Sequence, residues 1–187
     1  LIAVNDDLID FFDLKKISLT QLSKFFSGQE IPKGAVPIST VYAGHQFGHF
    51  VQKLGDGRAI LLGEILDKNN NRYDIQLKGS GLTAFSRSGD GKSPLGPSMR
   101  EYLISEAMHH LKIPTTRTLA LVKTGENVLR EKIYPGGISV RIAKSHIRIG
   151  SFEYFMAKKD YKNLEVLTNY SINRHFPWLI KQKNNIL

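Results

Sequence analysis

The fold is decided by four segments between residues 54 and 111, which read LGDGRAILLGEI (54–65), YDIQLKGSG (73–81), SRSGDGK (86–92) and PSMREYLISEAMHHL (97–111). Two glycine-flanked acidic turns, 55–58 and 89–92, enclose a strand that ends in Lys78, and a helix that carries Glu101 follows. Glycine lets backbone N–H groups approach a ligand closely. A lysine neutralises phosphate charge, and a carboxylate on the next helix can orient that lysine. These segments therefore predict a nucleotide site.

The surrounding hydrophobic pattern predicts a sheet with one prominent helix. Apolar and polar residues alternate from Tyr73 to Lys78, as in a strand with one buried face. The Asn-rich turn 67–71 makes this strand the second of a hairpin, and turns at 124–127 and 134–137 join three later strands into an antiparallel meander. The expected elements are strands at Ala59–Leu66, Arg72–Lys78, Thr115–Val122, Asn127–Tyr134 and Ile138–Ala143, and a helix at Pro97–Leu111.

Shorter helices are expected at both ends of the chain. Residues 8–14 and 19–28 carry apolar side chains at helical spacing, and Gly28 is expected to end the second helix. Ser151 and Asp160 are expected to cap helices at 152–158 and from 160 to about 174. The whole pattern predicts the α+β class, with a mostly antiparallel five-stranded sheet, the prominent helix between its second and third strands, and flanking helices.

Glu101 has two interpretations. Ser98 and Glu101 have the spacing of a capping box, in which the glutamate belongs to the start of its helix. Lys78 and Glu101 also have the order and spacing of the strand lysine and helix glutamate of a protein-kinase N-lobe, with the glycine turn 55–58 one strand earlier. Both interpretations stay open at this point.

Two familiar motifs are not completed. His45 and His49 stand four apart as in a zinc helix, but Gln46 replaces the glutamate and Gly44 and Gly48 disfavour a helix, so no metal site is expected there. Residues 89–93, GDGKS, resemble the end of a P-loop. The first glycine of that motif would be residue 86, which is serine, so a P-loop is excluded.

Composition narrows the class of protein. The chain has 187 residues, no cysteine and a net charge of +9, with its basic residues scattered rather than in runs. Disulfides and thiolate metal sites are therefore excluded, nucleic acid is not the favoured partner, and no apolar stretch is long enough to predict a membrane span.

The chain begins at Leu1 and ends without a recognisable terminal element, so we expect it to be part of a longer protein.

The motifs YAGHQFG, LGDGRAILLGE, QLKGSG, SRSGDGK, REYLISEAMHHLKIPTTR and VRIA…IRIGSFEYF together resemble selenoprotein O, the YdiU family of kinase-like adenylyltransferases, from about Val41 to Phe155. The resemblance implies transfer of AMP from ATP to Ser, Thr or Tyr hydroxyls of proteins, with ATP flipped relative to kinases and Mg²⁺ as the usual metal. Some bacterial members transfer UMP with Mn²⁺.

The resemblance also implies roles for individual residues. It places a nucleotide-covering loop at residues 55–58, the phosphate-binding lysine with its ion-pair partner on the strand and helix, nucleotide contacts in the second acidic turn, and two arginines at the phosphates. The implied nucleotide-binding residues are Gly55, Gly57, Arg58, Lys78, Asp90, Gly91, Glu101, Arg141 and Arg148.

The resemblance further implies an organisation and a limit. It divides the chain into an N-terminal helical segment (1–40), a kinase-like N-lobe with an αC-like helix (41–150) and the helical start of a C-lobe (151–187). The family's catalytic aspartate and metal ligands lie beyond Leu187, so the chain alone is expected to be nearly inactive. The expected location is the bacterial cytoplasm, or mitochondria in a eukaryote. A non-catalytic nucleotide- or nucleic-acid-binding remnant and a fragment of an ordinary protein kinase remain alternatives.

Overall fold

The computed structural model describes residues 1–180, which belong to two compact units. The first unit comprises Leu1–Thr40 and Asp56–His146, and the second comprises Val41–Gly55 together with the chain from Ile147 onward. Each unit has its own secondary structure and is described by itself. No helix among the described residues has the length and apolar character needed to cross a membrane.

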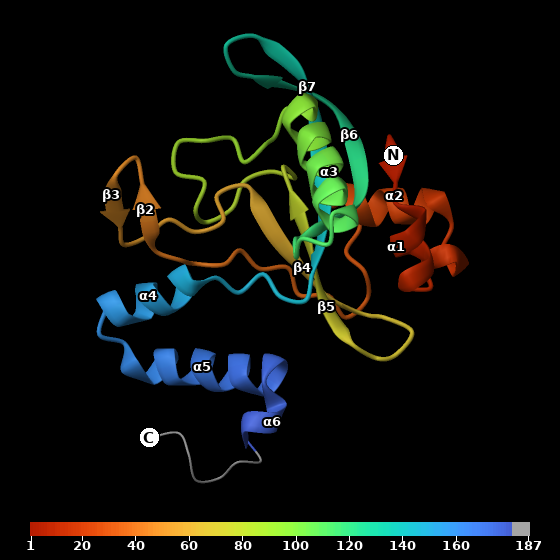
Figure 1. The fold of residues 1–187 in the computed structure, drawn as a ribbon. Coiled ribbons are helices and arrows are strands. Elements are labelled where there is room, and N and C mark those ends of the chain that lie inside the picture. Colours follow the sequence, from red (N-terminus) through yellow and green to blue (C-terminus); the bar gives the residue numbers. More distant parts are fainter. Residues whose placement is uncertain (181–187) are drawn as a thin grey trace. The chain divides into compact units, whose positions relative to one another are not determined.

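The first unit contains a five-stranded antiparallel sheet in the order β1-β6-β7-β5-β4 (Figure 1). The helix α3 (Leu95–His110) packs against β6 and β7 and follows β5 in the chain. The α+β class and the five-stranded antiparallel sheet are therefore confirmed. The strands are β1 (Ala3–Val4), β4 (Ala59–Leu66), β5 (Arg72–Lys78), β6 (Arg117–Leu129) and β7 (Ile133–Ala143).

The predicted hairpin is confirmed. β4 and β5 have the predicted bounds and pair antiparallel. Their turn is organised by Asp67, whose carboxylate accepts hydrogen bonds from the backbone N–H groups of Asn69 and Asn71, both at 2.8 Å. This is the local side-chain-to-backbone bonding that makes Asp and Asn frequent in turns.

The predicted three-stranded meander is wrong. Residues 117–143 form only two long strands, joined by a tight turn in which the Arg130 N–H donates to the Lys132 carbonyl at 3.0 Å. The residues read as a turn around Gly125 instead form an irregularity inside β6, where Gly125 has a φ of +81° and the pairing register shifts between Lys123 and Asn127. The fifth strand of the sheet is β1, which pairs with β6.

The helical prediction for the first residues is confirmed. They form α1 (Asp6–Phe11), a short 3-10 helix (Leu14–Lys16) and α2 (Leu19–Ser27), and Gly28 ends α2 in the left-handed conformation. These helices supply Leu8, Leu22 and Phe26, and the residue after α1 supplies Phe12, to a core shared with apolar residues of the sheet, which include Ile75, Leu77, Leu119, Val140 and Ile142. Removing these side chains from water is the main stabilising contribution to the unit.

The prominent helix begins two residues earlier than predicted, at Leu95, and Pro94 precedes it without a side-chain cap. Ser98 is buried inside the helix, and its hydroxyl lies 3.1 Å from the Ser93 hydroxyl. Ser98 is therefore not a cap, and the capping-box interpretation of Glu101 is wrong.

In the second unit, β2 (Gly44–Gln46) and β3 (His49–Val51) form a small hairpin. His45 and His49 thus lie on strands, so the helical zinc pattern is not formed. The unit also contains α4 (Ile149–Ala157), α5 (Tyr161–His175) and α6 (Pro177–Ile180).

The caps predicted for the second unit have different outcomes. Asp160 caps α5 as predicted, because its carboxylate accepts from the Asn163 N–H at 3.2 Å. Ser151 does not cap α4, since that helix begins at Ile149. The Ser151 hydroxyl instead donates to the Val41 carbonyl at 2.8 Å, which attaches α4 to the segment before β2.

Candidate functional site

Lys78 is the last residue of β5, and its side chain forms an ion pair with the helix α3. The Lys78 Nζ lies 2.5 Å from the Glu101 Oε1, with 23% and 39% of the two side chains exposed. Lys78 and Glu101 are 23 positions apart in the sequence, and they come together because α3 packs over the sheet that contains β5. This geometry favours the second interpretation of Glu101, as the carboxylate that holds the strand lysine extended.

Arg141 of β7 lies on the same face of the sheet. It pairs in register with Gln76 of β5, two residues before Lys78, so both strands direct these side chains to one side. The Arg141 Nη1 donates to the Gln76 Oε1 at 2.8 Å, and Gln76 is fully buried. A neutral amide beneath the guanidinium orients it and leaves its positive charge in place.

The side chains of Lys78, Glu101 and Arg141 line one hollow of about 590 Å³ between α3 and the sheet. Lys78, Arg100 and Arg141 contribute positive charge to its lining, and Glu101 is the single carboxylate. An open hollow with three cations and one carboxylate suits an anion with several oxygens, such as a di- or triphosphate. The structure therefore brings together three of the residues singled out in the sequence: Lys78, Glu101 and Arg141.

The long loop from Gly79 to Pro94 packs against the first acidic turn. The Thr83 hydroxyl donates to the Asp56 carbonyl and the Ser86 hydroxyl to the Gly57 carbonyl, both at 2.6 Å. A Cβ on Gly57 would lie 2.8 Å from the Phe85 carbonyl oxygen, so the close approach of the two segments requires glycine. The sequence did not indicate that this loop is bonded to the first acidic turn.

Gly91 of the second acidic turn is also required by geometry. It has a φ of +67°, and a Cβ there would collide with the Gly81 carbonyl. The neighbouring Asp90 accepts hydrogen bonds from both terminal nitrogens of Arg130, each at 2.9 Å. These bonds, with one from the Lys92 N–H, lower the pKa of Asp90 to about 2.

Arg130 is a residue that sequence reasoning missed. It stands 40 positions after Asp90, in the turn between β6 and β7. No periodicity or motif relates the two positions, and the prediction of a strand at 127–134 concealed the turn. The signal lies only in the three-dimensional pairing of the β6–β7 hairpin.

The remaining predicted residues are distributed between the units. Gly57, Arg58, Asp90 and Gly91 belong to the first unit, where the Arg58 carbonyl accepts from the Gly79 N–H at 2.7 Å. Gly55 and Arg148 belong to the second. There, the Arg148 guanidinium lies 4.7 Å from the centre of the Tyr42 ring, in cation–π geometry.

The chain is similar in sequence to proteins of a known family. The family model of protein adenylyltransferase SelO matches residues 1–187. This chain belongs to the SelO family. Protein nucleotidyltransferase YdiU of Pelagibacter ubique (strain HTCC1062) is 55% identical over 189 residues, which cover 100% of this chain and 39% of that protein. The protein of the same name from Nitrobacter hamburgensis (strain DSM 10229 / NCIMB 13809 / X14) is 61% identical over 81% of this chain and 30% of its own length.

The match covers most of this chain but only part of each relative. The YdiU protein of Maridesulfovibrio salexigens (strain ATCC 14822 / DSM 2638 / NCIMB 8403 / VKM B-1763) is 56% identical over 88% of this chain but only 33% of that protein. The SelO-family chain thus spans between 30% and 39% of the length of these three relatives. The resemblance read from the motifs is confirmed, and the family as named is one of protein nucleotidyltransferases.

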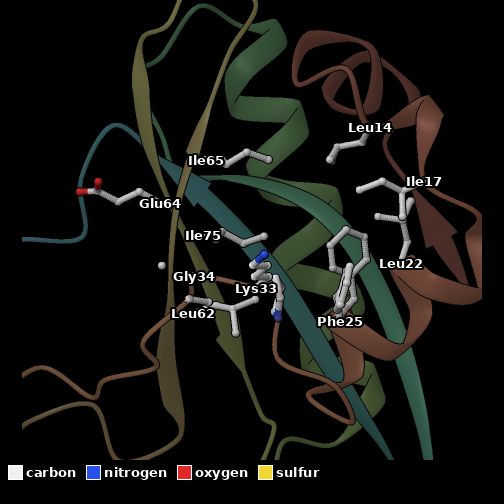
Figure 2. A pocket seen from close by; sticks show the side chains of 14 residues that line it. Leu14, Ile17, Leu22, Phe25, Lys33, Gly34, Leu62, Glu64, Ile65 and Ile75 are labelled. Carbon is white, nitrogen blue, oxygen red and sulfur yellow. The ribbon is translucent and has the colours of Figure 1, made fainter.

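This SelO-family chain has a second hollow, of about 330 Å³, where α2 and the 3-10 helix face β4 and β5 (Figure 2). Its lining is mostly apolar and includes Leu22, Phe25, Leu62 and Ile75. Ile75 and Gln76 are adjacent on β5 and project to opposite faces, so this hollow lies on the face of the sheet away from Arg141. Sequence reasoning did not predict it, because both of its walls read as ordinary core.

Proposed function

We propose that these 187 residues are the nucleotide-binding part of a protein adenylyltransferase, with the first unit resembling a protein-kinase N-lobe and α3 in the role of its αC helix. The observation that carries the proposal is the ion pair between Lys78 and Glu101, which lines the same hollow as Arg141. Membership of a family named for protein nucleotidyl transfer supports it.

The proposed reaction attaches AMP to a protein. A Ser, Thr or Tyr hydroxyl attacks the α-phosphorus of ATP, the bond to the β-phosphate oxygen breaks, the hydroxyl proton passes to a base, and pyrophosphate leaves. Charge on the phosphate oxygens must be stabilised throughout, and fixed cations do this without reorganisation. Lys78 and Arg141 supply such cations, and Glu101 keeps Lys78 in place.

The other residues have supporting roles in the proposal. The backbone of Gly55, Gly57 and Arg58 covers the nucleotide, and Asp90 and Gly91 give the flipped nucleotide a second set of contacts. Arg148 has its role in the proposal from the family resemblance alone, which assigns it to the phosphates. The division into residues 1–40, 41–150 and 151–187, with the last as the start of a C-lobe, is part of the same proposal.

The ligands for Mg²⁺ or Mn²⁺, as the family resemblance implies, lie beyond Leu187, and so does the base. Residues 1–180 contain no group of three His, Asp or Glu side chains that could hold a metal ion. Glu101, the one carboxylate lining the hollow, is already bonded to Lys78. Since both the metal ligands and the base would come from outside this chain, we propose that AMP transfer by the chain alone is weak.

Binding of ATP to the chain tests the proposal. Lys78→Ala removes a charge-assisted contact with phosphate and is expected to weaken ATP binding at least about tenfold, which is the effect of losing roughly 1.5–3 kcal/mol. Lys123→Ala is the matched control, because Lys123 is an exposed lysine of β6 that does not line the hollow. Titration calorimetry measures both. Equal affinity of Lys78→Ala and the unmodified chain would refute the role of Lys78.

Transfer is tested in a protein that extends the chain to the length of its relatives. With ATP labelled at the α-phosphate, the acceptor protein is expected to become labelled, and Lys78→Ala is expected to abolish the label. With ATP labelled at the γ-phosphate, the acceptor is expected to stay unlabelled. Label from the γ-phosphate alone would identify an ordinary kinase instead.

A further inference from the structure

The β6–β7 hairpin holds the second acidic turn by a bidentate ion pair. We propose that Arg130 is a positioning residue, which fixes the turn Asp90–Lys92 against the end of the hairpin so that the turn is already ordered when a nucleotide arrives. This inference rests on the proposed function for its link to nucleotide binding. The hold of Arg130 on the turn is a separate, structural claim.

The contacts of Arg130 are specific. Its Nη1 donates to Asp90 Oδ2 and its Nη2 to Asp90 Oδ1, both at 2.9 Å, which is the fork geometry that only arginine provides. The same Nη2 donates to the Lys92 carbonyl at 3.0 Å, and the Lys92 N–H donates to Asp90 Oδ1 at 2.9 Å. One guanidinium therefore fixes both the side chain and the backbone of the turn.

Other contacts fix the C-terminal part of the loop to the same hairpin. The Lys92 Nζ lies 2.8 Å from a Glu126 carboxylate oxygen, and the Gly137 N–H donates to the Ser93 carbonyl at 2.8 Å. At Gly91, the backbone contact is a longer bond to its carbonyl, from the Gly81 N–H at 3.2 Å. Arg130 thus adds a forked, charge-assisted pair at the tip of the turn, where the backbone bond is longer.

This arrangement changes the role expected of Asp90. Both of its carboxylate oxygens accept hydrogen bonds from Arg130. The carboxylate therefore also acts through the shape of the turn, and it holds the backbone around Gly91 in one conformation for a ligand. Ordering such a loop before binding lowers the entropy cost of binding, so loss of Arg130 weakens affinity without removing a phosphate contact.

Hydrogen exchange on the 187-residue chain tests the structural claim without a nucleotide. In Arg130→Ala, backbone amides of residues 90–93 are expected to exchange roughly 5–10-fold faster, as expected for losing a partly exposed forked pair. Arg130→Lys keeps the charge without the fork, so its exchange rates at residues 90–93 are expected to be closer to those of Arg130→Ala than to those of the unmodified chain. Unchanged exchange of this turn in Arg130→Ala would overturn the proposal.

Arg72→Ala is the matched control. Arg72 also forms a bidentate pair, with Glu64 across the β4–β5 hairpin, and its Nη2 lies 2.6 Å from the Glu64 Oε1. Its loss is expected to leave exchange at residues 90–93 unchanged. If Arg72→Ala accelerates exchange in that turn as much as Arg130→Ala does, the effect is general loosening of the unit and the proposal fails.

ATP affinity tests the link to nucleotide binding. Arg130→Ala is expected to weaken ATP binding about 3–10-fold, equivalent to roughly 0.7–1.4 kcal/mol, and Arg72→Ala is expected to leave it unchanged. Faster exchange in the turn with unchanged ATP affinity would overturn the link. If the unmodified chain binds no ATP, the proposed function fails, while the exchange experiment still decides whether Arg130 positions the turn.

Discussion

Within the described residues, two ion pairs join the helix α3 to the sheet, and they differ in burial and in the number of hydrogen bonds that each glutamate accepts. Glu101 accepts from Lys78 alone in the part of the chain that the structure describes, and the pair lines the open hollow. Glu106, five residues later, accepts from Arg117, from the Asn5 amide at 2.7 Å and from the Thr118 N–H at 3.3 Å. Only 18% of the Arg117 side chain and 13% of the Glu106 side chain are exposed.

The difference distinguishes a structural pair from one that is available to a ligand. Burial alone would raise the pKa of Glu106, but the hydrogen bonds from Arg117 and Asn5 outweigh burial and leave that pKa below its ordinary value. Because Glu106 joins α3, β6 and the residue before α1, its contacts serve to fix the helix. The Lys78 ammonium, bonded to one carboxylate and lining a hollow, retains donors for another anion.

The largest effect is expected from breaking the buried pair. Glu106→Ala leaves Arg117, Asn5 and the Thr118 N–H without their acceptor, so the free energy of unfolding should fall by about 2–4 kcal/mol, somewhat less than for a fully buried pair. Urea unfolding followed by circular dichroism measures this change. Glu165→Ala, at an exposed glutamate of α5, is the control and should stay within about 0.5 kcal/mol of the unmodified chain.

The same pair predicts a pH dependence. Since the pKa of Glu106 in the folded chain lies below its ordinary value of 4.5, its stabilising effect is complete above that pH and is lost as the pH falls through the folded pKa. The stability difference between the unmodified chain and Glu106→Ala should therefore be largest near neutral pH and shrink in acid. A difference that stays constant from pH 7 to pH 3 would contradict this assignment.

An intermediate effect, of a different kind, is expected from the open pair. Glu101→Gln removes the charge that holds Lys78, but partly exposed pairs contribute only about 0–1 kcal/mol to stability. We therefore expect little change in the free energy of unfolding. ATP affinity should fall roughly 3–10-fold, which is less than for Lys78→Ala. If Glu101→Gln destabilises the chain as much as Glu106→Ala does, the two pairs are alike and the comparison fails.

The sequence predicted those parts of the site that depend on local pattern. Alternation and the Asn-rich turn gave both ends of β4 and β5 correctly, and these strands place Lys78. Gly28 ends α2 as predicted, because only a residue tolerant of positive φ suits that position. In these cases the information lies within a few residues of the feature it determines.

The failures concern contacts between distant residues. β1 has only two residues, so it has no period to detect, and its pairing with β6 is what makes it a strand. The turn expected around Gly125 became part of β6 because pairing with β7 continues across the irregularity. Ser98 has the spacing of a cap but is buried in the helix. Arg130 contacts Asp90 only because the β6–β7 hairpin places the two residues side by side.

The smallest effect is expected at Gln76, which lies two residues before Lys78 on β5 and pairs with Arg141 of β7. It is fully buried, its Oε1 accepts from Arg141, and its Nε2 has no hydrogen-bond partner within the described residues. Methionine has a similar shape and lacks that donor, so Gln76→Met should change the free energy of unfolding by less than about 1 kcal/mol, in either direction.

What Gln76→Met removes is one restraint on Arg141, so ATP affinity should fall by less than about fivefold, or roughly 1 kcal/mol. Gln76→Glu is the informative companion variant, because a carboxylate at this position would pair with Arg141 and neutralise its charge at the hollow. It should weaken ATP binding more than Gln76→Met does. The reverse order would mean that Arg141 contributes no charge to the site.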